Sequence, residues 1–191
     1  DKPFGTFRDY GFNLNLYYKQ PQKNENAWIF FLNTSNTRGF LPFIPIPGAG
    51  YFFSSTSWRG LIGIPFAMIF WTPSPTWTFS AFFFPLRFGE LRLSYGAPRK
   101  IQIFSLTAFR GRTYWLSDRQ NDKERLFFEE GTTQLGVSAP IYRGVNLEIS
   151  GGFAFARKYF LAEKMTERAK SPQINPESSD FANAKLGVFF P

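Results

Sequence analysis

The chain has 191 residues, which suits a single domain over residues 1–191, and 20% of them are aromatic, with 26 Phe alone. Cys and His are both absent, so the side chains that most often bind metals or act as general bases near neutral pH are missing. We therefore expect no metal site, no cofactor and no catalytic residues. The formal net charge of +8 comes from scattered basic residues, so we also expect no nucleic-acid partner.

The secondary structure is predicted to be nearly all β. No stretch approaches the roughly 18 apolar residues of a membrane-spanning helix, and the mean hydropathy is −0.22. Alternation of apolar and polar residues with a period of two recurs along the chain, which is typical of strands with two different faces. The pattern predicts about ten strands, within a range of roughly 8 to 12. In chain order they lie near residues 4–18, 27–34, 39–54, 58–71, 76–84, 88–96, 100–116, 124–139, 144–161 and 181–190.

The alternation is clear at both ends of the chain. In the first strand Leu14 and Leu16 alternate with Asn13 and Asn15. In the strand near residues 145–155 the apolar positions include Leu147, Ile149 and Phe153, and in the last strand they include Leu186 and Val188. Residues 39–50 are the exception, because Pro42, Pro45 and Pro47 remove ladder donors, so we expect an irregular edge-like strand or an inward-folded loop there.

The pattern fits two classes of protein with opposite meanings, a soluble β-sandwich or lipocalin-like barrel and a membrane barrel. The connections favour the membrane barrel. Compact turns are predicted at one end, near residues 35–38, 72–75, 96–99 and 140–143, while longer polar loops at 19–26, 117–123 and 162–180 lie at the other, with short links near Ser55 and Pro85. We therefore predict an antiparallel transmembrane β-barrel of the bacterial outer membrane whose apolar faces look outward. The charged segment 114–130 is expected to project beyond the bilayer.

The large aromatic residues are predicted to form two girdles at the membrane interfaces, because amphipathic rings prefer that boundary. The girdle beside the compact turns consists of Trp71, Trp77, Tyr95 and Tyr142, and the opposite girdle of Trp28, Trp58, Trp115 and Tyr159. In a soluble barrel the same rings would be core residues.

Charged residues on the opposite faces of the strands are predicted to form a network in the lumen, where they satisfy one another. Its members are Asp9, Glu90, Arg92, Glu148 and Lys185. Catalysis by these carboxylates is not expected, because no His is present to act as a base with a pKa near working pH.

Two segments resemble outer-membrane proteins. Barrels of that membrane commonly end in a polar residue, a Gly and two aromatic residues at fixed spacing; Lys185, Gly187 and Phe190 match the first three, and the place of the second aromatic residue falls one position after Pro191. Residues 69–77, with Pro73, Ser74 and Pro75 before Trp77, followed by Pro85 and residues 91–98, resemble a bacterial outer-membrane β-barrel family of unknown function with a Pro-Ser turn and a Trp. The resemblance implies fold and location but no activity.

Two functions remain open. In the first, the protein is a non-catalytic structural or adaptor subunit that anchors a partner, an outer-membrane or periplasmic protein, in the lipid bilayer, and the loop at 162–180 makes the contact. In the second, it is a narrow channel or transporter for small solutes, with an anion-favouring interior formed by Arg92, Arg110, Arg112 and Lys158.

Overall fold

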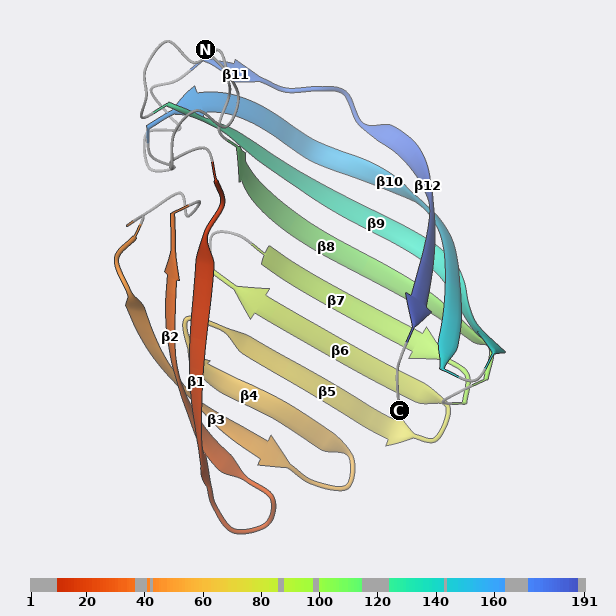
Figure 1. The fold of residues 1–191 in the computed structure, drawn as a ribbon. Coiled ribbons are helices and arrows are strands. Elements are labelled where there is room, and N and C mark those ends of the chain that lie inside the picture. The colour runs from red at the N-terminus through yellow and green to blue at the C-terminus, as the bar shows by residue number, and fades with distance from the viewer. Residues whose placement is uncertain are drawn as a thin grey trace.

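A computed structural model describes residues 10–36, 41, 43–85, 88–97, 100–114, 124–142, 144–163 and 172–188. These residues form one antiparallel sheet of 12 strands and contain no helix (Figure 1). Accordingly, none of them belongs to a helix that is long and apolar enough to cross a membrane. The prediction of an all-β antiparallel protein is confirmed.

The strands follow one another in the sheet in chain order from β1 to β10, and both β11 and β12 pair with the free edge of β10. Their bounds are β1 Asn13–Pro21, β2 Ala27–Ser35, β3 Ile46–Ser54, β4 Trp58–Ile64, β5 Ala67–Ser74, β6 Trp77–Phe84, β7 Phe88–Tyr95, β8 Gln102–Tyr114, β9 Arg125–Tyr142, β10 Val145–Ala162, β11 Gln173–Ile174 and β12 Ser179–Val188.

The sheet is strongly curved, and β1 and β12 lie on either side of its opening (Figure 1). No pairing joins these two strands within the described residues, so the sheet is not closed there and a closed barrel stays a prediction. Every neighbouring pair is antiparallel, which means that β1 and β12 run in the same direction.

The two faces of the curved sheet differ as the alternation predicts. We call the concave side, which carries Arg92 and Glu148, the inner face, and the convex side the outer face. Large apolar residues of the outer face are exposed: Leu135 by 67%, Leu186 by 62% and Phe153 by 42%. The register places no charged residue on the outer face of β1–β8. Small and polar side chains such as Ser94, Ser138 and Ser150 are buried on the inner face.

The prediction of one strand over residues 58–71 is wrong, because this segment forms two strands, β4 and β5. Pro65 has no amide hydrogen to donate to the ladder, and the chain turns there. The two-residue strand β11 was not predicted either. An irregular strand or a loop was predicted over residues 39–50. Regular pairing begins at Ile46, the first residue of β3, and Pro47 lies within that strand.

The split of residues 58–71 changes which connections share an end of the sheet. The connections that follow β1, β3, β5, β7 and β9 are at one end, which we call the hairpin end, and those that follow β2, β4, β6, β8 and β10 are at the other, which we call the loop end. The longest connections are still at the loop end, but the connections that follow β1, β2 and β3 lie at the opposite end from the one predicted. The reason is parity, because each additional strand reverses the direction of all those before it.

Strands β8, β9 and β10 are longer than the others and extend the sheet at the loop end (Figure 1). A bulge interrupts β10 between Phe155 and Lys158, and Ala156 there has a φ of 50°. Beyond the bulge the alternation of faces is reversed. The predicted extended hairpin at 114–130 is consistent with this extension where it is described, and residues 115–123 lie outside the described part.

Candidate functional site on the inner face

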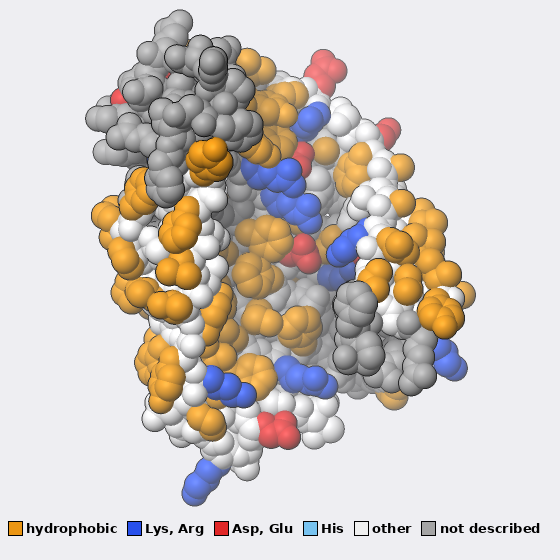
Figure 2. All heavy atoms as spheres, in the orientation of Figure 1, with side chains coloured by type: hydrophobic (Ala, Val, Ile, Leu, Met, Phe, Trp, Pro, Cys, Tyr) orange, Lys and Arg blue, Asp and Glu red, His pale blue; other side chains and the backbone are white. Residues whose placement is uncertain are grey.

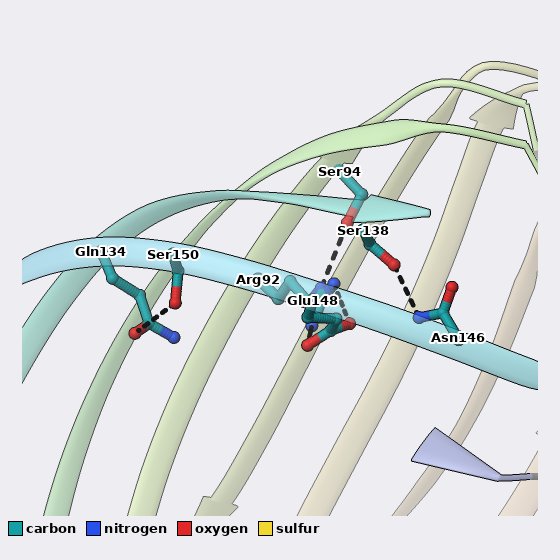
Figure 3. Close-up of polar contacts among 7 residues, drawn as sticks. All are labelled: Arg92, Ser94, Gln134, Ser138, Asn146, Glu148 and Ser150. Atoms are coloured by element: carbon teal, nitrogen blue, oxygen red, sulfur yellow. Dashed lines mark hydrogen bonds and ion pairs between the residues drawn. The ribbon is translucent and has the colours of Figure 1, made fainter. Parts of the chain in front are cut away.

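The best-defined polar contact of the inner face is an ion pair between Arg92 on β7 and Glu148 on β10 (Figure 3). Nη2 of Arg92 lies 2.8 Å from Oε1 of Glu148, and Nη1 lies 3.4 Å from Oε2, so the guanidinium meets the carboxylate with two nitrogens. The guanidinium carbon also lies 4.0 Å from the centre of the Phe104 ring on β8. Strands β7 and β10 are separated by β8 and β9, about 14 Å along the sheet, so only a strongly concave surface brings the two side chains together.

Small polar side chains lie on both sides of this pair, and one of them, Ser94, bonds to it directly (Figure 3). Nε of Arg92 donates to Oγ of Ser94 at 3.3 Å. On the neighbouring strands, Asn146 donates from Nδ2 to Ser138 Oγ at 2.8 Å, and Ser150 donates to Gln134 Oε1 at 3.3 Å. These residues all belong to β7, β9 and β10, so one half of the inner face is polar and internally satisfied.

The other members of the predicted charge network lie in different surroundings. Glu90 on β7 forms a longer ion pair with Arg110 on β8, with 3.6 Å between Oε2 and Nη2. Lys185 on β12 is exposed and stands directly opposite Glu148 in the register. Asp9 lies outside the described residues. The structure therefore joins Arg92 with Glu148 and Glu90 with Arg110, two partnerships that the sequence did not specify.

The cations predicted for an anion-favouring interior divide between the faces. Arg110 stands opposite Glu130 and Arg112 opposite Phe128 in the ladder of β8 and β9, and both arginines lie on the inner face with Arg92. Lys158 stands opposite Glu129, which places it on the outer side of the extension. Its expected position is wrong because the bulge in β10 precedes it.

The Trp and Tyr residues of the outer face gather at the hairpin end. Trp58 stacks on Trp71 with ring centres 5.0 Å apart, and Trp77 contacts Tyr95 at 4.9 Å. Trp28, Trp58 and Tyr142 border connections of that same end, so the assignment of Trp28 and Trp58 to the opposite girdle is wrong. The split of residues 58–71 is the reason, since it reverses the ends of the strands before it.

The structure does not place the two remaining residues of the girdle predicted for the loop end, Tyr159 and Trp115, on the outer face. Tyr159 stacks on Phe128 at 4.5 Å, on the side of the sheet that carries Arg112, because the bulge in β10 turns it inward. Trp115 lies outside the described residues. The rings at the hairpin end therefore form a belt, while no second outer belt is defined within the part of the chain that the structure describes.

The sequence did not reveal a series of rings on the inner face, which we call the ring band. It consists of Tyr17, Phe31, Phe66, Phe82 and Phe88, from β1, β2, the link between β4 and β5, β6 and β7. Alternation along one strand places a ring on a face, but only the register across strands shows that these rings touch. The ring band thus lies on the β1–β7 part of the inner face, and the polar contacts around Arg92 lie on β7, β9 and β10.

Among the described residues no group of three or more acidic, His or Cys side chains is placed to hold a metal ion. Comparison of the chain with protein-family models, with curated proteins and with solved structures finds no match. The resemblance to a bacterial outer-membrane barrel family therefore stays a prediction.

Proposed function

We propose that the protein is embedded in the bacterial outer membrane as a transmembrane β-barrel and that its outer face contacts lipid. The observation that carries this proposal is the absence of charge from the outer face of β1–β8, beside ion pairs on the inner face. A soluble antiparallel sheet buries its apolar face and exposes its polar one, so the reverse arrangement favours contact with acyl chains.

The dimensions of the strands and the position of the aromatic residues support the same proposal. Strands β1–β7 have 7 to 9 residues, close to the roughly 9 to 11 that a tilted strand needs to cross the hydrocarbon. The belt of Trp and Tyr at the hairpin end matches the interfacial position that such rings prefer. In outer-membrane barrels the short turns are periplasmic, so the loop end would face outward from the cell.

Within the membrane we propose a non-catalytic structural or adaptor role, in which the protein anchors an outer-membrane or periplasmic partner. The ion pair of Arg92 and Glu148 supports this role, because it crosses the inner face and occupies space that a wide pore would leave open. In both charged pairs the carboxylate is held by an arginine, which supports a structural rather than a catalytic use of these carboxylates.

A narrow channel for small anions is the second candidate, and one observation favours it. Figure 2 shows the molecule hollowed between its two edges, with Lys and Arg side chains reaching into the hollow. Planar-bilayer conductance separates the two roles. We expect the purified protein to give no stable current steps; clear steps with anion-selective reversal potentials would replace the adaptor role by the channel.

The membrane location is tested by two arginine substitutions on the same strand. Leu186→Arg places a charge on the outer face of β12, and Asn183→Arg places one on the inner face; both residues are exposed. We expect Leu186→Arg to reduce the free energy of unfolding of the vesicle-embedded protein by up to about 2 to 4 kcal/mol, the cost of a charge at the bilayer midplane, and Asn183→Arg to change it little. Urea titration of vesicle-bound protein measures both. Equal, small effects would identify a soluble protein, because both sites would then face water.

A further inference from the structure

The ring band makes a continuous apolar strip across the inner face. Successive ring centres are 6.4 Å apart from Tyr17 to Phe31, 4.9 Å from Phe31 to Phe66, 6.3 Å from Phe66 to Phe82 and 5.3 Å from Phe82 to Phe88. Each contact joins residues of different strands or links, so the strip runs across the strands and not along one of them. Rings that line a hollow remain partly in contact with water unless something apolar covers them.

The strip ends at a cation. The guanidinium carbon of Arg110 lies 5.8 Å from the centre of the Phe88 ring. The ion pair of Arg110 with Glu90 is long, at 3.6 Å, and Nε of Arg110 is buried with no hydrogen-bond partner among the described residues. The Arg110 side chain is nevertheless 37% exposed, so its outer nitrogens, held only by the long pair with Glu90, are accessible to an acceptor that would stabilise this charge. Arg112 lies on the same face two residues further along β8.

The inner face carries more basic than acidic residues on the described strands. The register assigns to it Lys19, Arg59, Arg92, Arg110, Arg112 and Lys185 against Glu90, Glu130 and Glu148. Figure 2 shows hydrophobic side chains and charged side chains exposed together in the hollow. An occupant complementary to this surface is apolar over most of its length and negatively charged at one end.

We propose that the inner face binds a long-chain fatty acid as its carboxylate. The acyl chain lies on the ring band, and the carboxylate accepts hydrogen bonds from Arg110 where the band ends. A guanidinium presents parallel donors that match the two oxygens of a carboxylate, which gives the headgroup a defined position. A single chain fits because the band is one ring wide at each strand. The inference does not depend on the adaptor role or on membrane insertion, since it uses inner-face residues alone.

The test measures binding of radiolabelled hexadecanoate to the full chain kept soluble by an amphipathic polymer, so no bilayer is required. Phe82 and Phe83 provide a matched pair, because Phe82 belongs to the ring band while Phe83 lies on the outer face and is 58% exposed. We expect saturable binding that Phe82→Ala weakens severalfold and Phe83→Ala leaves unchanged. If Phe82→Ala does not fold, Phe82→Leu replaces it, with a smaller loss expected because an apolar side chain remains.

The headgroup is tested separately. Arg110→Gln should weaken hexadecanoate binding about tenfold or more, since it removes a charged hydrogen-bond donor, while Arg59→Gln, which alters an inner-face cation on β4 away from the ring band, should not. Hexadecanol, which has the same chain without the charge, should bind the wild type about tenfold more weakly than hexadecanoate. Absence of saturable binding, equal binding of the alcohol, or equal losses in Phe82→Ala and Phe83→Ala would each overturn the proposal, because chain and headgroup would then not be recognised at this face.

Discussion

At the scale of single residues, the ion pair of Arg92 and Glu148 is the contact that most directly reports the shape of the protein. The side chains of Arg92 and Glu148 are only 24% and 20% exposed. The guanidinium of Arg92 contacts three groups: the Glu148 carboxylate, the Ser94 hydroxyl and the Phe104 ring. The atoms of the ion pair come from strands that are not neighbours, so the pair forms only when the sheet has its native curvature. Replacing one partner leaves the other charge partly buried and unpaired.

Glu148→Gln should therefore destabilise the protein more than a surface substitution does. We expect a loss of about 1 to 3 kcal/mol in the free energy of unfolding, since Arg92 keeps its charge but loses a carboxylate that two of its nitrogens bind. Denaturant titration monitored by tryptophan fluorescence measures the loss, with Lys185→Gln as the control on the facing position of β12. A value for Glu148→Gln no larger than for the control would mean that the pair does not support the fold.

At the scale of elements, the ring of Phe104 on β8 lies over a position of β9 where a glycine leaves room for it. A Cβ on Gly136 of β9 would lie 2.6 Å from Cζ of Phe104 and 2.6 Å from the carbonyl oxygen of Ile149. Phe104 is buried to 2% exposure and stacks with Arg92, so it has little room to move. Gly136 therefore leaves the space that the Phe104 ring occupies over β9.

Gly136→Ala should cost about 1 to 3 kcal/mol of unfolding free energy through overpacking. Gly151 on β10 supplies the matched control, because a Cβ there would meet only the carbonyl oxygen of Phe181, at 3.8 Å. Gly151→Ala should change stability little. The same denaturant titration measures both variants, and equal stability of the two would show that Phe104 can move aside without cost.

At the scale of the whole molecule, the distribution of polarity between the two faces is the inverse of that in a soluble sheet. The outer face exposes large apolar residues over β1–β8 and on into β9, β10 and β12, while buried serines and ion pairs lie on the inner face. In water this surface would associate with other apolar surfaces, because exposed patches of this size are rare in monomeric soluble proteins.

Folding should therefore depend on an amphiphile. We expect the chain, diluted from urea into detergent micelles or lipid vesicles, to acquire a β-type far-UV circular dichroism spectrum, and the chain diluted into buffer alone to aggregate. Sedimentation of the two preparations distinguishes them. A folded monomer in buffer without any amphiphile would contradict the proposed membrane location.

The sequence by itself indicated most of the strands and their two faces, because alternation is a local property: Leu14, Ile149 and Leu186 are exposed on the outer side as their spacing predicts. It also placed Glu90, Arg92 and Glu148 on one side, but it misplaced Lys158, which the bulge in β10 puts on the outer side. It did not determine partners, since the contact of Arg92 with Glu148 depends on the curvature of four strands. Nor did it indicate that a single turn at Pro65 would exchange the ends of the strands before it, or that rings from Tyr17 to Phe88 would meet in one band. Those features belong to the tertiary structure alone, because register and strand parity are set by pairings between distant parts of the chain.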